Sequence, residues 1–211
     1  MNVAAILPCR GRKEQTIVNA KRLIQTAGYD TWRLYAIGGK EESDTLTALA
    51  KLGVPTMTAE ADRLTYWQAL AEATSVTAEP LIACLANDLI PGQHWLRRAV
   101  DGYTAAFGGG MGMIGFNGDS HELSHSCHFL ISRSLIDRYG GWPVWYDHTF
   151  GDTELCERAI ADGYYAKAPW AILFHDHPYW GGQDDSTYAE GRALIERDQR
   201  LYEQRRSRQW Q

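Results

Sequence analysis

The sequence predicts an α/β fold, with a mostly parallel central sheet and helices on both of its faces. Short apolar runs of strand length alternate with segments of helical periodicity, the pattern of a sheet built from strand–helix units. The run at 81–85 is apolar throughout, as expected of a buried central strand. The 211-residue chain shows no internal repeat and no linker-like stretch, so 1–211 is expected to form a single domain.

The first half divides into short elements bounded by glycines. Ile17, Ala20, Leu23 and Ile24 share one helical face, and Gly28 follows as a stop. The elements expected here, in order, are a strand at 3–8, a helix at 14–27, a strand at 32–37, a helix at 44–52, a short strand at 54–57, a helix capped by Asp62 that runs towards 76, and the strand at 81–85.

The second half is less regular. Its expected elements are a helix at 95–107, strands at 113–116 and 128–131 on either side of a polar, His-rich loop, a short helix at 134–139, a helix at 152–162, a strand at 166–174 broken early by Pro169, and a charged terminal helix at 188–206.

Composition narrows the class of protein. A net charge of −5 argues weakly against wholesale binding of nucleic acid. No run of about 18 apolar residues is present and the first residues carry no charged leader, so the expectation is a cytoplasmic protein without a membrane span. The cysteines form no CxxC pair and favour buried free thiols over disulfides or zinc; they are Cys9, Cys84, Cys127 and Cys156.

Asp88 follows the central strand, in the stretch Ala86-Asn87-Asp88 before Pro91. An Asn-Asp pair is ordinary turn chemistry. In an open α/β sheet, however, ligands bind at the carboxyl ends of the strands. A hard divalent cation needs few protein oxygens when substrate phosphates supply the others, so Asp88 is a candidate ligand for Mn²⁺ or Mg²⁺.

Asp152 stands at the expected start of a helix. It could act only as an N-cap, or it could face the cavity as a general base. The aromatic run before it could exclude water and present flat faces to a sugar or base, or simply pack in the core. Its members Trp142, Trp145 and Tyr146 are the candidates for the acceptor side.

Two histidines flank Asp176 at the end of the last expected strand. Alternation along a strand points His175 and His177 the same way, so one or both are candidate metal ligands. A second group, His121, His125 and His128 with Cys127, could form a zinc site, although its serines and glycine favour a loop on the acceptor side.

Arginines follow the first strand. Arg10 and Arg12 could face a diphosphate or a base, or could be ordinary surface residues. The arginine-rich end of the chain could touch a polyanion but is more typical of a solvated helix end. That end carries Arg197, Arg200, Arg205, Arg206 and Arg208.

In their order and spacing these residues resemble the GT-A fold of nucleotide-sugar glycosyltransferases, in particular the large inverting family of bacterial polysaccharide glycosyltransferases. The stretch 8–12 is similar to the family's nucleotide-receiving loop, and 86–88 to its DxD motif. The stretch 151–158 is similar to its Glu-Asp helix start, and 174–178 to the strand end whose His joins the metal. The similarity covers nearly the whole chain.

The resemblance implies a role for each region. Residues 1–107 would bind the nucleotide, 108–187 would form the acceptor-side half, and 188–211 would be a C-terminal helix and basic tail. Pro8, Arg10, Arg12, Asn87 and Asp88 would contact the donor and its cation. The partners implied are a nucleotide-diphosphate sugar and an acceptor that is a glycan, a small molecule or a hydroxylated nucleic-acid base.

The sequence also departs from the family pattern. Ala86 replaces the first Asp of the DxD motif, so Asp88 needs a partner such as His175 or His177. Gly151 replaces the usual Glu, which leaves Asp152 as the candidate base for direct, inverting displacement. The stretch 37–40 lacks the acidic residue that usually contacts the base or ribose. Alternatives are a sugar-phosphate nucleotidyltransferase, a non-catalytic nucleotide-sugar binder, and a metal hydrolase built on the histidines.

Overall fold

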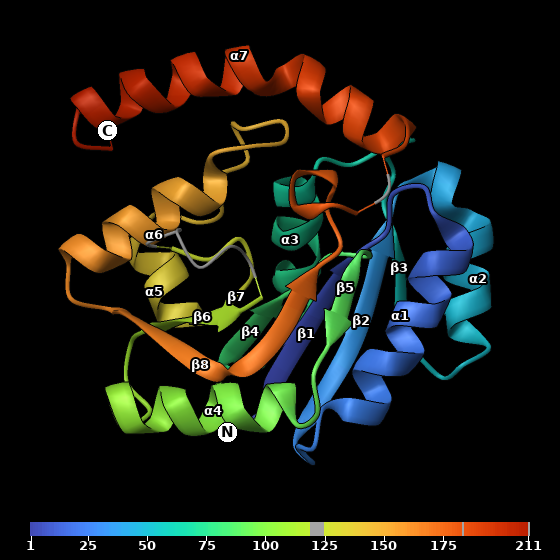
Figure 1. Cartoon of the computed structure of the whole chain (residues 1–211), viewed down its shortest axis with the longest axis horizontal. Coiled ribbons are helices and arrows are strands. Elements are labelled where there is room, and N and C mark those ends of the chain that lie inside the picture. Colours follow the sequence, from blue (N-terminus) through green and yellow to red (C-terminus); the bar gives the residue numbers. More distant parts are fainter. Residues whose placement is uncertain (119–124, 183, 211) are drawn as a thin grey trace.

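The computed structural model describes residues 1–118, 125–182 and 184–210; His121 lies outside them. The described residues form one eight-stranded sheet with the order β3-β2-β1-β4-β7-β6-β8-β5 (Figure 1). The strands are β1 (Val3–Pro8), β2 (Trp32–Gly38), β3 (Thr56–Thr58), β4 (Leu81–Cys84), β5 (Leu89–Pro91), β6 (Met113–Asn117), β7 (Phe129–Ser132) and β8 (Tyr165–His175).

The sheet is mixed, so the expectation of a mostly parallel sheet was wrong. β1 is parallel to both β2 and β4, and β6 is parallel to β8. β7, however, runs antiparallel to β4 and β6, and β5 runs antiparallel to β8. β6 and β7 are antiparallel neighbours, and only a parallel connection needs a crossover.

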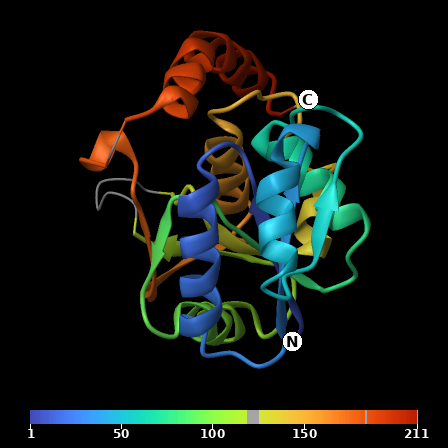
Figure 2. The ribbon, with the colours of Figure 1, turned by 90° about the vertical axis from the view of Figure 1, so that its right-hand side faces the viewer.

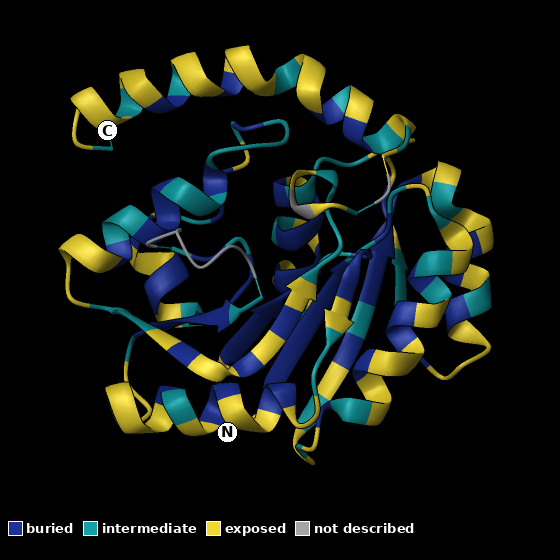
Figure 3. Ribbon diagram, in the orientation of Figure 1, coloured by how far each residue is buried: buried dark blue, intermediate teal, exposed yellow. Residues whose placement is uncertain are grey.

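Helices cover both faces of the sheet, as predicted. Along β1, Val3, Ala5 and Leu7 point into one core, while Ala4 and Ile6 point into the other. α1, α2 and α4 supply side chains to the first core, and α3, α5 and α6 to the second. Figure 3 shows that the central strands between these helices are largely buried. The helices are α1 (Lys13–Thr26), α2 (Ser43–Ala50), α3 (Tyr66–Ser75), α4 (Trp95–Phe107), α5 (Arg133–Arg138), α6 (Gly151–Ala161), α7 (Ser186–Ser207), and the short 3₁₀ helices η1 (Lys40–Glu42) and η2 (Pro178–Trp180).

Two helix caps differ from the sequence expectation. α3 is capped by Thr65 rather than Asp62, because the Thr65 hydroxyl accepts from the Gln68 amide and the Gln68 side chain accepts from the Thr65 amide. α6 follows Phe150, whose φ of 68° places it in the left-handed region, and Asp152 is therefore inside the first turn. Asp152 is accordingly not the N-cap.

Pro169 does not break β8 but coincides with an irregularity in it. Phe116 of β6 pairs with Ala168 and the next residue, Asn117, pairs with Ile172. The Asn117 side chain donates to the Pro169 carbonyl at 2.8 Å and holds this bulge. Beyond the bulge β8 pairs with β5, which the sequence analysis missed, and Leu89 lies opposite His175. This pairing brings the end of β8 beside Asp88.

The terminal helix α7 crosses above the carboxyl ends of the central strands (Figures 1 and 2). Its second half is firmly attached. The fully buried Asp198 accepts from the backbone amides of 147–149, at 2.8 Å for His148. Arg205 forms two hydrogen bonds, of 2.9 and 2.8 Å, with the buried Glu154 of α6. Burial alone would raise the pKa of Glu154, but the hydrogen bonds from Arg205 and Tyr146 lower it.

None of the described helices is long and apolar enough to cross a membrane.

Candidate functional site

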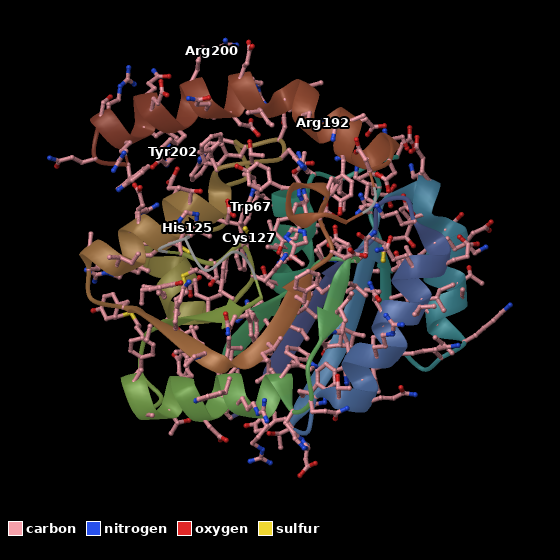
Figure 4. The ribbon with its side chains drawn as sticks, viewed as in Figure 1. Trp67, His125, Cys127, Arg192, Arg200 and Tyr202 are labelled. Carbon is pink, nitrogen blue, oxygen red and sulfur yellow. The ribbon has the colours of Figure 1, made fainter. Side chains whose placement is uncertain are left out.

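A cavity of about 540 Å³ lies at the carboxyl ends of β1 and β4, beneath the first turns of α7. Its walls come from segments far apart in sequence: the loop after β1, the start of α3, the loop after β4, the end of β8, the start of α6 and the start of α7. Figure 4 shows Trp67, His125 and Cys127 gathered in this central region. The predicted site residues on the lining are Pro8, Arg10, Arg12, Asn87, Asp88, His125, Asp152, His175 and His177.

Asp88 is the most heavily bonded acid on the cavity wall. One carboxylate oxygen, Oδ2, accepts from Arg12 at 2.9 Å and from the Tyr188 hydroxyl at 2.6 Å. The other, Oδ1, lies 3.4 Å from His175 Nε2. Burial alone would raise the pKa of Asp88, but the His175 and Tyr188 interactions hold it well below the usual range. Asp88 is therefore ionised at neutral pH.

The predicted proximity of Asp88 to a histidine is confirmed, and the histidine is His175. The ring of His177 lies 5.0 Å from that of His175, and its Nδ1 accepts from the Tyr179 amide at 3.1 Å. Burial and the neighbouring His175 lower the pKa of His177 to about 4, so His177 is neutral at pH 7. His128, from the other His group, stacks edge-on against His175 at 4.8 Å.

These side chains can hold part of a metal site. No group of three or more His, Cys, Asp or Glu residues in the described part of the chain is arranged to bind a metal. Asp88 Oδ1 and His175 Nε2, at 3.4 Å, are nevertheless spaced much as two neighbouring ligands are. Two atoms each about 2.1 Å from one cation at a right angle are separated by about 3 Å. The spacing of the pair therefore fits two neighbouring ligand positions around one cation.

Arg12 connects the site to α7. Its Nη1 donates to Asp88, and its other edge forms a bidentate pair with Asp185, from Nε to Oδ2 at 2.5 Å and from Nη2 to Oδ1 at 2.9 Å. The guanidinium also lies over the Tyr188 ring at 3.8 Å. Burial alone would lower the pKa of Arg12, but the two carboxylates raise it, so the side chain stays charged.

The other predicted donor-side residues hold the loops in place. Arg10 Nη2 donates to Glu190 of α7 at 2.6 Å. Asn87 donates to the Arg10 carbonyl at 3.1 Å, and its own carbonyl accepts from Asn19 at 2.8 Å. Asn87 thus ties the loop after β4 to the loop after β1, and keeps Asp88 and Arg12 on the same wall.

Asp152 lies on the cavity wall, in the first turn of α6. Within the described ranges, no hydrogen bond or ion pair involves its carboxylate. The next residue, Thr153, lies 3.4 Å from His125 Nε2. A partly exposed carboxylate that faces a cavity without a protein partner is available to accept a proton from a bound molecule.

The aromatic residues expected on the acceptor side lie elsewhere. Trp142 and Tyr146 are buried in the second core, with 5% and 0% of their surfaces exposed, so they cannot contact a ligand in the cavity. Trp142 stacks on Trp67, and the Tyr146 hydroxyl donates to Glu154 at 2.9 Å. Trp145 is partly buried beneath Arg205 and is absent from the cavity lining. The expectation for these three residues is therefore withdrawn.

The terminal arginines are largely neutralised and do not frame the cavity. Arg205 pairs with Glu154, and Arg206 with Glu157. Arg200 lies on the outer side of α7, whereas Tyr202 faces α6 (Figure 4). Cys9, Cys84 and Cys156 are buried, as predicted, whereas Cys127 is only partly buried and lies on the cavity wall.

Several residues of the cavity lining were not predicted from the sequence. They are Tyr66, His148 and Ile195, together with Thr187 and Tyr188, which follow Asp185 at the start of α7. A helix start at Asp185 was readable, since Asp followed by Ser and Thr is an N-cap pattern. Nothing in the sequence indicates that this helix start folds back onto Asp88, because about a hundred residues separate Asp88 from Tyr188.

Solved structures with a similar architecture include a mannosyltransferase and a glucosyl-3-phosphoglycerate synthase. The chain superposes on a mannosyltransferase from Pyrobaculum calidifontis, solved with GDP-Man and Mn²⁺, with a TM-score of 0.68 and 15% identity. The match covers 82% of this chain and 56% of that one. This is a GT-A glycosyltransferase-like fold.

Two further GT-A structures are similar. TarS from S. aureus matches with a TM-score of 0.65 and 9% identity, over 83% of this chain and 60% of TarS. Glucosyl-3-phosphoglycerate synthase from Mycobacterium tuberculosis was solved with Mn²⁺, UDP and phosphoglyceric acid. It matches with a TM-score of 0.63 and 13% identity, over 85% of this chain and 73% of the synthase. This chain thus spans less than two thirds of the length of the first two. No protein-family model matches the sequence, and no curated protein does either.

Proposed function

We propose that this chain transfers a sugar from a nucleotide-diphosphate sugar to an acceptor hydroxyl. The observation that carries the proposal is one cavity, at the carboxyl ends of β1 and β4, that holds a cation-compatible acid, an arginine and a free carboxylate. The acid is Asp88 beside His175, the arginine is Arg12 and the free carboxylate is Asp152. The GT-A architecture supports this assignment at the level of the fold.

In the proposed reaction the two carboxylates have different roles. Asp88 and His175 would hold Mn²⁺ or Mg²⁺ together with the diphosphate, and the cation would supply positive charge at the leaving group. Arg12 lies next to Asp88 and would stabilise the charge that develops on the departing diphosphate. Pro8, Arg10 and Asn87 would shape the nucleotide end of the cavity.

Asp152 would act as the general base. Its carboxylate would accept the proton of the acceptor hydroxyl while that oxygen attacks the anomeric carbon and the bond to the diphosphate oxygen breaks. A single displacement of this kind inverts the anomeric configuration. His125 lies 3.4 Å from Thr153, the residue after Asp152, and would be on the acceptor side.

The acceptor class is best approached by elimination. Glycans, small molecules and nucleic acid with a hydroxylated base all present a hydroxyl. The net charge of −5 and the ion-paired terminal arginines give least support to a polyanion. An acceptor panel should therefore begin with neutral glycans and small alcohols.

A donor panel tests the proposal. UDP-, GDP- and other nucleotide-diphosphate sugars are incubated with the protein, with Mn²⁺ or EDTA, and mass spectrometry detects the free nucleoside diphosphate. We expect one donor class to be turned over by the wild type. Asp152→Asn should lower turnover about 10²-fold or more, because general-base catalysis typically contributes that much. Release of pyrophosphate from a nucleoside triphosphate and a sugar phosphate would point to a nucleotidyltransferase instead.

A further inference from the structure

The start of α7 occupies the edge of Arg12 that faces away from Asp88. Asp185 receives both donors of that edge, Nε and Nη2, in a bidentate pair, while Nη1 is bound to Asp88. A carboxylate and a phosphate present similar paired oxygens to a guanidinium. In this conformation Arg12 therefore has its recognition edge already filled by an anion from its own chain.

The two ion pairs of Arg12 are unequal. The side chains of Arg12 and Asp88 are 8% and 5% exposed, whereas that of Asp185 is 36% exposed. Solvent weakens the outer pair relative to the inner one. Asp185 also has other partners, since its Oδ1 accepts from the amides of Thr187 and Tyr188 at 2.9 and 3.1 Å. If Arg12 turned to another anion, Asp185 would remain hydrogen-bonded as the N-cap of α7.

The attachments of α7 divide it into two parts. The second half is held by the buried Asp198 and by the Arg205–Glu154 pair. At the cavity the first turns are held through Asp185 on Arg12, the Tyr188 hydroxyl on Asp88, and Glu190 on Arg10. Outside the lining, Glu190 also pairs with Arg63 at 3.3 Å, and the Tyr188 hydroxyl donates to the Asp176 carbonyl at 3.1 Å. The three contacts at the cavity fall on Arg12, Asp88 and Arg10, which line its donor side. The anchors of the second half of α7 are therefore separate from those that place its first turns over the donor side.

We propose that Asp185 is an autoinhibitory stand-in for a donor phosphate, and that a nucleoside diphosphate displaces it from Arg12. The exchange rests on the proposed function, because it assigns the diphosphate to Arg12. No covalent bond changes: one bidentate anion replaces another on the same guanidinium edge. Tyr188, which contacts both Arg12 and Asp88, leaves the cavity with Asp185 and opens the space beside the cation-binding pair.

The test compares two neighbouring acids at the start of α7. Asp185→Asn and Asp185→Ser remove the charge but keep a residue that can cap α7. Asp184→Asn is the matched control, because Asp184 pairs with the exposed Arg192 and does not touch Arg12. Calorimetric titration with UDP and GDP gives the dissociation constant of each variant at one fixed salt concentration.

We expect both Asp185 variants to bind the preferred nucleoside diphosphate about 3- to 10-fold more tightly than the wild type, with the control unchanged. Equal or weaker binding by both, while the wild type still binds, overturns the exchange and leaves the proposed function standing. If neither the wild type nor either Asp185 variant binds UDP, GDP or pyrophosphate, the proposed function fails and the exchange fails with it. Melting temperatures of the variants without ligand verify that each is folded.

Discussion

Asp88→Asn should destabilise the fold as well as abolish transfer. Asp88 is 5% exposed and is the inner partner of Arg12, while Tyr188 and His175 contact the same carboxylate. Removing one member of a buried pair typically costs 3–5 kcal/mol. Because Asn keeps one hydrogen-bonding oxygen and Asp185 still neutralises Arg12, we expect the free energy of unfolding to fall by about 3 kcal/mol, the lower end of that range. For a chain of this size that lowers Tm by roughly 6–12 °C.

Asp152→Asn is the matched control for that prediction. Both acids line the same cavity, but Asp152 has no bonded partner in the described ranges, so its free energy of unfolding should change by no more than about 0.5 kcal/mol. Both variants should lose transfer, but only Asp88→Asn should lose stability. Urea unfolding at pH 7, with the slope checked for constancy, measures both values. An Asp88→Asn protein as stable as the wild type would refute the Arg12–Asp88 pairing described above.

Three further outcomes follow from the contacts. Burial alone would raise the pKa of Glu154, but its hydrogen bonds produce a net lowering. The ionised side chain therefore stabilises the folded state fully above the ordinary carboxyl pKa of 4.5, and this stabilisation is lost as the pH falls through the lowered pKa. The gap in Tm between wild type and Glu154→Gln should therefore be roughly 6–12 °C at pH 7, from about 3 kcal/mol, and should narrow as the pH falls below the ordinary carboxyl pKa of 4.5. A gap that widens in acid would contradict this sign. Gly151→Ala should cost about 1–3 kcal/mol in urea unfolding, because the new methyl group would overlap the Trp67 indole; no loss would mean that the indole moves freely. Mn²⁺ should raise the Tm of the wild-type protein beyond the value reached with a nucleoside diphosphate alone. His175→Ala should abolish this additional rise in Tm, whereas His177→Ala should retain most of it. The opposite result would exchange the proposed roles of the two histidines.

The regular elements were readable from the sequence because their signals are local. β1 and α4 lie at the predicted residues, since an apolar run or a single helical face suffices to define each. β5 was missed because it has only three residues and owes its conformation to pairing with the distant β8. The mixed order of the sheet was missed for a related reason: strand direction depends on partners that no local pattern encodes.

The candidate site divides along the same line. Residues at strand ends, such as Asp88 and His175, could be predicted to meet, because the edge of a sheet collects them. The contribution of α7 could not, because Asp185 and Tyr188 reach the cavity through the path of a whole helix. The aromatic run failed as a predictor because burial, which decides whether Trp142 packs or binds, is a property of the tertiary structure.

One departure from the glycosyltransferase pattern, the glycine at position 151, has a structural origin in Trp67. The indole lies against the Gly151 backbone, and a Cβ at that position would overlap it. A glutamate at 151 is therefore sterically excluded while Trp67 remains, and the indole is fixed in turn by stacking on Trp142. With that carboxylate excluded, Asp152 is the acid that α6 presents to the cavity in its first turn. Asp152 is therefore the residue proposed above as the base, and Trp142, expected to face the acceptor, instead stacks behind Trp67 and supports the cavity wall.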